Sequence, residues 1–138
     1  MNISENSRNI IVEEINYVVK QMEQSSTGEE KLFYFSAIFS MIQRIFNLEY
    51  DSDLVYMHFI LNGAYHSFFQ RIQAIKAGET LIPLEEEHFE KLIAITKELA
   101  KKMGENKSID STLKKLAILS YTTSGNGYYL LQKGLLKI

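Results

Sequence analysis

The sequence predicts an all-α fold, a bundle of five main helices followed by a short C-terminal helix. Apolar residues recur at helical spacing along most of the 138 residues, and the chain contains one proline. No alternating apolar and polar run is bounded by turns as a strand would be. We expect a single α-helical domain over residues 1–138, because a chain of this length with 46% apolar residues can bury one compact core.

The first two helices are predicted by amphipathic spacing and by a start signal between them. The first should run from about Asn9 to Gln24, and its apolar side consists of Ile11, Ile15, Val18 and Met22. Thr27 and Glu30 have the spacing of a capping box, so the second helix should follow Thr27 and end near Leu48. This second helix has two apolar stripes, more apolar surface than a peripheral helix needs.

The third helix is expected from about Asp53 to Ala77, after an N-cap at Asp51 or Ser52. One apolar face consists of Leu54, Met57, Leu61, Tyr65, Phe68, Ile72 and Ile75. A second consists of Val55, Phe59, His66 and Phe69. Because a helix with two apolar faces belongs inside a bundle, we expect the third helix to be central.

The fourth and fifth helices are predicted by their ends. Pro83 and the glutamates after it suit the first turn of a fourth helix, and Gly104 should end it. Its buried stripe is Phe89, Leu92, Ile93, Thr96, Leu99 and Met103. Ser108 can cap the fifth helix, whose stripe is Ile109, Leu113, Leu116, Ala117, Ser120 and Tyr121.

The break "SGNG" at residues 124–127 precedes the predicted short helix that begins at Tyr128. It could present backbone N–H groups to an anion, but it lacks a preceding strand and the lysine of a phosphate loop. A tight corner between helices explains the glycines and the asparagine better. We therefore expect Gly125 or Gly127 to have a positive φ. The leucines after the corner should be largely buried: Leu130, Leu131 and Leu135.

Composition narrows the classes of partner and site. The net charge is -2 with both signs interspersed, so no nucleic-acid partner is expected. The chain has no cysteine, which excludes disulfides, thiolate metal sites and a cysteine nucleophile. The N-terminus lacks the pattern of a secretory signal, so a cytoplasmic protein is expected. The uncharged run Leu54–Gln70 approaches the length of a membrane helix, but its histidines, Asn62 and Ser67 favour a bundle helix without a membrane span.

Few residues suggest reaction chemistry. Glu85 and His88 form one Glu-x-x-His pair, whereas a dimetal carboxylate bundle needs two such pairs, so a solvated acidic first turn is the better interpretation. His58 and His66 lie too far apart along one helix to share a metal. We expect His66 to be hydrogen-bonded within the core rather than a general base. No catalytic, cofactor-binding or metal-binding residue is assigned, and enzymatic activity stays open, with the balance against it.

The C-terminal segment "HFEKLIAITKELAKKMGENKSIDSTLKKLAILSYTTSGNGYYLLQKGLLKI" resembles the last three helices of poxviral Bcl-like proteins. The shared features are an Ile-x-Ile helix that ends in Met103 and Gly104, a short polar link, a helix with Leu116 and Ala117, and a brief terminal helix. The resemblance implies a compact α-helical protein without enzymatic activity, made in the host cytoplasm. Such proteins bind host signalling or apoptosis proteins, and suppress NF-κB or interferon signalling or capture death-promoting helices in a groove.

The function predicted is therefore a non-enzymatic protein-interaction module, with a viral Bcl-like modulator of host innate immune or apoptotic signalling as the finer hypothesis. The surplus apolar stripes would bind a protein partner or a second copy of the chain, unless they simply pack on each other. The candidate partner-binding residues are Phe33, Tyr34, Met41, Tyr56 and Phe69. The alternatives are a microbial accessory subunit of a larger complex and a small helical ligand- or metal-binding protein or enzyme, to which Glu85, His88, His66 or "SGNG" would contribute.

Overall fold

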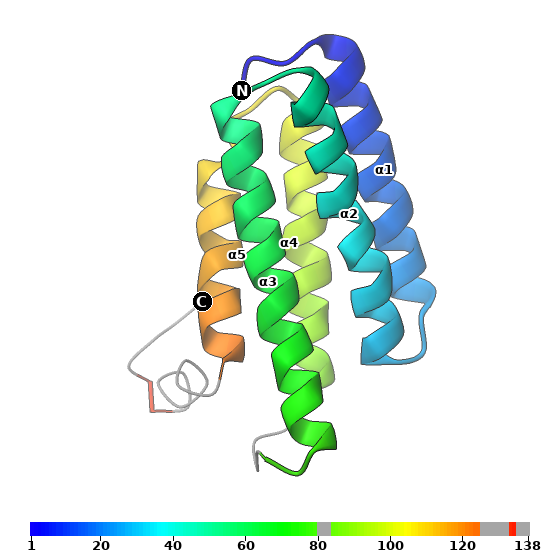
Figure 1. Ribbon diagram of the computed structural model, residues 1–138, viewed down its shortest axis with the longest axis vertical. Coiled ribbons are helices and arrows are strands. Elements are labelled where there is room, and N and C mark those ends of the chain that lie inside the picture. The colour runs from blue at the N-terminus through cyan, green and yellow to red at the C-terminus, as the bar shows by residue number, and fades with distance from the viewer. Residues whose placement is uncertain (80–83, 125–132, 135–138) are drawn as a thin grey trace.

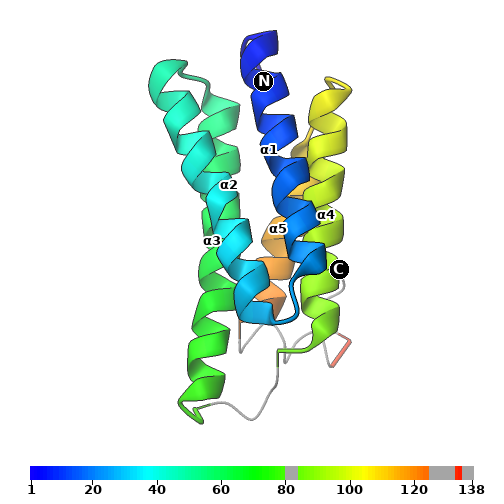
Figure 2. The same cartoon turned by 90° about the vertical axis from the view of Figure 1, so that its right-hand side faces the viewer.

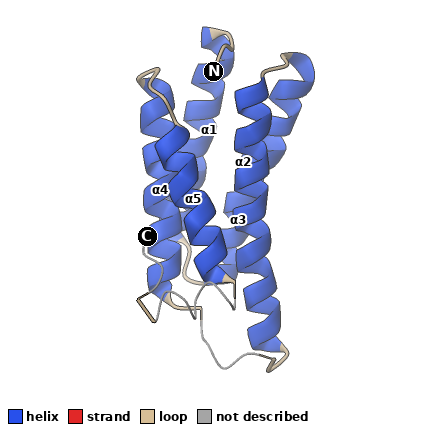
Figure 3. Cartoon of the chain, turned by 90° about the vertical axis from the view of Figure 1, so that its left-hand side faces the viewer, coloured by secondary structure: helices blue, strands red, loops and turns tan. Residues whose placement is uncertain are grey.

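The computed structural model describes residues 1–79, 84–124 and 133–134, and in these residues it contains five α-helices and no strand (Figures 1 and 3). The predicted all-α class is confirmed. The helices are α1 (Glu5–Gln24), α2 (Gly28–Leu48), α3 (Ser52–Lys76), α4 (Glu86–Gly104) and α5 (Asp110–Thr123). The predicted terminal helix, the two glycines of "SGNG", the three leucines after them and Pro83 lie outside the described residues.

The five helices stand side by side as the wall of a closed bundle (Figures 1 and 2). α1 packs between α2 and α4, α3 packs between α2 and α5, and α4 packs on α5 to close the ring. The inward faces form one apolar core. Its largest fully buried side chains include Phe35, Phe68, Ile11, Ile15, Met22, Ile38, Ile42, Leu54, Met57, Leu61, Leu92 and Leu99.

The expectation that the third helix is central is wrong, because α3 is part of the wall and has α2 and α5 as its main neighbours. Leu54, Met57 and Phe68 on its first apolar face are buried. Its second face diverges from the expectation, since Phe59 is 72% exposed. In a ring of five helices, each helix turns one face to the core and packs against two neighbours, so a second apolar face lies in solvent.

The starts of α2 and α3 agree closely with the sequence signals. The Thr27 hydroxyl accepts from the backbone N–H of Glu30 at 3.1 Å, and Oδ1 of Asp51 accepts from that of Leu54 at 3.0 Å. α1 begins earlier than expected because the Ser4 hydroxyl accepts from the backbone N–H of Ser7 at 3.1 Å. Each of these bonds satisfies a donor that the first turn of a helix leaves without a partner.

The link between α4 and α5 differs in detail from the prediction. Gly104 is the last residue of α4 rather than the residue that stops it, and Asn106 takes the left-handed conformation with a φ of 55°. Asparagine tolerates that conformation better than most residues. The N-cap of α5 is Ile109, and Ser108 instead accepts from the backbone N–H of Asp110 at 3.3 Å.

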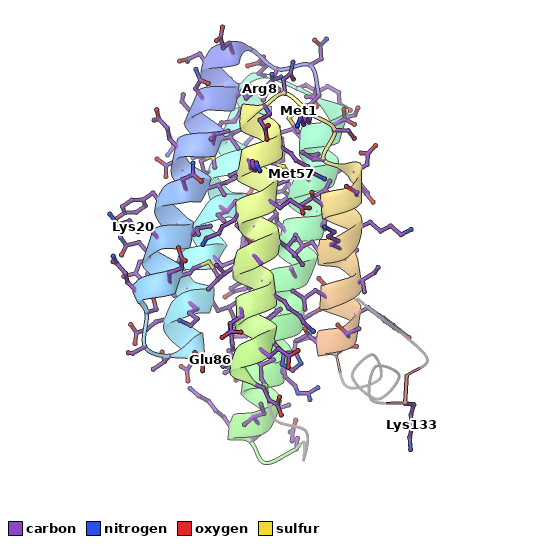
Figure 4. All side chains as sticks on the ribbon, turned by 180° about the vertical axis from the view of Figure 1, so that it is seen from behind. Met1, Arg8, Lys20, Met57, Glu86 and Lys133 are labelled. Carbon is purple, nitrogen blue, oxygen red and sulfur yellow. The ribbon has the colours of Figure 1, made fainter. Side chains whose placement is uncertain are left out.

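The N-terminal segment is tied to the link between α2 and α3. The backbone N–H of Asn2 donates to Oδ2 of Asp51 at 2.8 Å, and the amine of Met1 lies 2.9 Å from a carboxylate oxygen of Asp53. Figure 4 shows Met1 and Arg8 at one end of the bundle, with Glu86 far down toward the other end. Asp51 thus caps α3 and anchors the start of the chain.

Candidate functional site: the α2–α3 face

Most of the exposed large apolar side chains in the described part of the chain lie on α2, α3 and the link between them. They are Phe33, Leu48, Tyr50, Tyr56, Phe59, Phe69 and Ile75. The same helices carry long uncharged stretches, with no charged residue between Lys31 and Arg44 or between Asp53 and Arg71. Monomeric proteins rarely expose large apolar patches, and patches of this kind often mark interaction sites.

A groove runs between α2 and α3, and we call it the α2–α3 groove. Its lining is Glu29, Leu32, Phe33 and Ser36 from α2 with Tyr65, Phe69, Ile72 and Gln73 from α3. A second hollow adjoins it, shares Glu29 and Ile72 with it, and continues past Ile75 to Leu84 and Phe89. Oε1 of Glu29 and Nζ of Lys76 lie 2.9 Å apart and link the two helices at this end. The floor of the groove is therefore apolar and its charged groups are paired at the rim.

A chain of aromatic ring contacts extends from the groove residues Phe69 and Tyr65 into the space between α2 and α3. His58 lies edge-on to Phe46 and Phe39, with centroids 5.4 and 6.1 Å apart, and Phe39 lies edge-on to Tyr65 at 5.3 Å. Tyr65 in turn stacks on Phe69 at 5.7 Å. Edge-on and offset-stacked rings attract each other beyond their burial. Burial lowers the pKa of His58, so this imidazole is neutral at pH 7 and packs as one more ring.

The structure brings together two of the five predicted partner-binding residues. Phe33 and Phe69 line the groove and are 69% and 40% exposed. Tyr56 is also exposed but does not line the groove, and Tyr34 and Met41 are half-buried against the core. Whether any of the five binds a partner stays a prediction.

Sequence reasoning did not single out Phe59, Ile72 or Ile75 as surface residues. The sequence places all three on apolar faces of a central helix, but Phe59 and Ile75 are exposed and Ile72 is half-buried, because α3 is part of the wall. No local signal marks Phe59 as exposed, because a helix in the wall of a bundle usually carries charges on its outer side and the run around Phe59 has none, which favours burial.

Of the three histidine and glutamate candidates for chemistry, His66 lies on α3 beside Tyr65, and Glu85 and His88 lie at the start of α4. His66 is exposed, so the expectation of a core histidine is wrong. Glu85 is exposed, whereas His88 is buried and its Nδ1 accepts from the backbone N–H of Glu85 at 3.2 Å. The expected solvated first turn therefore holds for the glutamates and fails for His88. Among the described residues, no group of three or more histidines and carboxylates is placed to hold a metal ion.

No helix in the described ranges combines the length and the hydrophobicity that crossing a membrane would require. Comparisons of the chain with protein-family models, with curated proteins and with solved structures give no match. The resemblance of residues 88–138 to poxviral Bcl-like proteins accordingly stays a prediction from the sequence.

Proposed function

We propose that this protein is a protein-interaction module that binds the apolar face of a helix from a partner protein in the α2–α3 groove. The observation that carries the proposal is the pairing of Phe33 and Phe69 at one apolar groove between two helices. Neither side chain is needed to fill the core, since both are exposed.

The chemistry of the groove favours a helix as the bound element. Its floor is apolar, and Ser36 and Gln73 offer polar groups beside it. An amphipathic helix lays apolar side chains at positions i, i+3 or i+4, and i+7 into such a groove, and its polar side stays in water. Covering Phe33 and Phe69 would contribute on the order of 1–2 kcal/mol each, at roughly 25 cal/mol per Å² of apolar surface removed from water.

The finer proposal concerns the partner's class. The resemblance to poxviral Bcl-like proteins supports a host protein of NF-κB, interferon or apoptotic signalling. A microbial accessory subunit would use the same groove to join its complex. Both ideas predict a protein ligand, and both differ from a ligand-binding or metal-binding protein in needing no polar pocket.

Site-specific photo-cross-linking in the cells that naturally make the protein tests the proposal. A photo-reactive amino acid replaces Gln73 at the groove in the full chain, and Asn16, which is exposed on α1, in the control. We expect protein adducts at Gln73 that are absent at Asn16. The double variant Phe33→Ser, Phe69→Ser should remove them.

A matched variant guards against a general loss of surface apolarity. Tyr17→Ser changes a side chain on α1 that is 60% exposed, and it should leave the Gln73 adducts unchanged. Urea unfolding checks that the variants fold, since exposed substitutions usually change stability by about 0.5 kcal/mol or less. Identical adducts at Gln73 and Asn16, or adducts that survive the double variant, would contradict the proposal.

A further inference from the structure

A cavity of about 340 Å³ lies where the end of α1 and the start of α2 meet the first turns of α4, and we call it the α1–α4 cavity. Its apolar lining is Phe89, Ile93 and Ala94, all from α4. It shares no lining residue with the α2–α3 groove, so it is a separate site. Pockets for small ligands usually measure about 300–1,000 Å³, are mostly apolar and carry a few charged or polar groups. The α1–α4 cavity therefore has the size and character of a small-ligand site.

The cavity is open because α1 ends before it covers the start of α4. The two helices run in opposite directions (Figure 2), and Oε2 of Glu23 in the last turn of α1 lies 2.8 Å from Nζ of Lys97. α4 begins at Glu86, so about 16 Å of this helix precedes Lys97, at 1.5 Å per residue. Ile93 on this stretch stays half-buried and Ala94 stays exposed.

The positive charges of the lining already have partners within the chain. Nζ of Lys31 donates to the backbone carbonyl oxygens of Met22 and Ser25, at 2.9 and 2.6 Å. These carbonyl groups lie at the C-terminal end of α1, where a cation is favoured. Lys97 is paired with Glu23. Both ammonium groups therefore hold the end of α1 and are not directed to a bound anion.

Two negative charges at the rim, those of Glu86 and Glu90, have no such partner. Both side chains are exposed, and neither carboxylate forms a hydrogen bond or an ion pair with another described residue. They lie at positions i and i+4 of α4, where like charges repel each other and destabilise a helix. The helix dipole favours Glu86 in the first turn, but its influence ends before Glu90. Glu87, by contrast, is paired with Lys91 at 3.1 Å and does not line the cavity.

A ligand that suits this lining has an apolar body and a positive charge. Its body would cover Phe89 and Ile93, and an ammonium or guanidinium group beside Glu86 and Glu90 would remove their mutual repulsion. A calcium or magnesium ion suits the cavity less well, because it takes about six or more oxygen ligands. The described residues contain no group of three or more histidines and carboxylates placed to hold a metal ion.

We propose that the α1–α4 cavity binds a small organic cation, an amine or guanidine with an aryl or branched alkyl body. The two unneutralised carboxylates beside an apolar floor carry the inference. It is independent of the function proposed for the α2–α3 groove, because the two sites have no lining residue in common.

An NMR titration of the full, isotope-labelled chain tests the site with three probes of similar shape. Phenylbutylammonium is cationic, phenylbutanol is neutral and phenylbutanoate is anionic at pH 7. At low ionic strength, where exposed charges are least screened, the cation should shift the signals of Ile93 and Ala94. It should bind at least about threefold more tightly than the alcohol, as expected for exposed ion pairs. The anion should bind more weakly than the alcohol.

Two double variants separate the charges at the rim from the overall charge. Glu86→Gln, Glu90→Gln should lower the affinity for phenylbutylammonium to that for phenylbutanol. Glu13→Gln, Glu14→Gln removes the same charge from exposed positions on α1 and should keep the preference for the cation. Urea unfolding verifies that both variants fold.

Ala94→Lys supplies the missing cation from within the chain. The new ammonium group follows Glu90 by four residues, the favourable order for an ion pair on a helix. This exposed substitution should raise the urea midpoint slightly and abolish the preference for phenylbutylammonium. A variant that is more stable and yet has lost the cation cannot owe the loss to misfolding.

Three results would overturn the inference: equal affinity for the three probes, signal shifts outside the α1–α4 cavity, and a cation preference that survives Glu86→Gln, Glu90→Gln. Tighter binding of acetyl-phenylalanyl-lysine amide than of phenylbutylammonium would assign the cavity to a basic segment of a protein and would also overturn it. The same double variant should keep the Gln73 adducts of the α2–α3 groove, so failure of one proposal is distinguished from failure of the other.

Discussion

Arg71 on α3 binds the C-terminal end of α5, because its Nη1 donates to the backbone carbonyl oxygen of Thr123 at 3.1 Å. Both residues are buried, and Thr123 is the last residue of its helix. The last carbonyl groups of a helix have no partner within it and carry partial negative charge, so a cation is favoured there. This buried hydrogen bond therefore links the C-terminal end of α5 to α3.

Replacement of Arg71 should destabilise the fold. In Arg71→Met the stem remains similar and the donors are lost, so we expect the free energy of unfolding to fall by roughly 1.5–3 kcal/mol, as for hydrogen bonds to charged groups. Urea unfolding measures the change. Lys76→Met, an exposed position on the same helix, serves as the control and should cost less than about 1 kcal/mol. Equal effects of the two substitutions would show that the bond to Thr123 contributes little.

Two histidines should make stability depend on pH near neutrality. Burial lowers the pKa of His88, with the charge of Arg71 acting in the same direction, and burial also lowers that of His58. A group with a lower pKa in the folded state contributes stability that is present above its unfolded value of about 6.5 and is lost as the pH falls below it. We expect the urea midpoint to decrease from pH 7.5 to pH 5.5.

The variant His88→Gln separates the two histidines. The glutamine oxygen can accept from the backbone N–H of Glu85 as Nδ1 of His88 does, and it does not titrate. This variant should keep most of the stability at pH 7.5 and lose less of it at pH 5.5 than the natural chain. An unchanged pH profile would mean that His88 has no part in the effect.

Asp51 should matter for both α3 and the N-terminal segment. Burial alone would raise its pKa, but the backbone N–H groups of Asn2 and Leu54 more than offset this, and the pKa is lowered. Its contribution is therefore present above the unfolded value of about 3.9 and lost as the pH falls through that range. At pH 7, Asp51→Ala should cost about 1–2 kcal/mol, typical of a lost N-cap.

Hydrogen exchange distinguishes the two roles of Asp51. Faster exchange of the Leu54 amide reports the lost cap, and faster exchange of the Asn2 amide reports the lost anchor. Ser52→Ala, at the exposed neighbouring position, should leave both amides unchanged. Protection of Asn2 that survives in Asp51→Ala would contradict the anchoring role.

Two glycines should respond in opposite directions to alanine. A Cβ at Gly28 would lie 2.6 Å from Cζ of Phe89, a buried ring that packs on Phe68 at 5.1 Å. We expect Gly28→Ala to cost about 1–3 kcal/mol through overpacking. Gly63→Ala meets open space on a helix and should add roughly 0.5–1 kcal/mol. Thermal unfolding at submicromolar chain concentration measures both without a contribution from self-association; a gain at Gly28 would show that Phe89 moves freely.

Local signals allowed much of the fold to be predicted. The Thr27 and Asp51 caps and the spacing of residues such as Ile11 and Ile15 depend on neighbours within a turn or two, and hydrogen-bond geometry and the 3.6-residue period make these readable from the sequence. The α5 start was predicted less well, because its N-cap, Ile109, is a buried apolar residue chosen by the core rather than by capping chemistry.

The candidate face could be predicted only in part. His88 shows the same limit, because its burial could not be predicted although its spacing to Glu85 could be seen. That burial depends on helices distant in sequence, such as α3 with Arg71. The sequence predicts Phe33 and Phe69 as partner-binding residues, but nothing local says that they meet at one groove.

The sequence by itself determined that the chain forms helices, where most of them begin, and that two of them carry more apolar surface than one face needs. Only the tertiary structure decided that α3 stands in the wall of a ring, with Phe59 outside and His66 in water. The reason is physical: a helical period shows that a residue shares a face with others, but which face is buried depends on how many helices surround it, a property of the whole packed bundle.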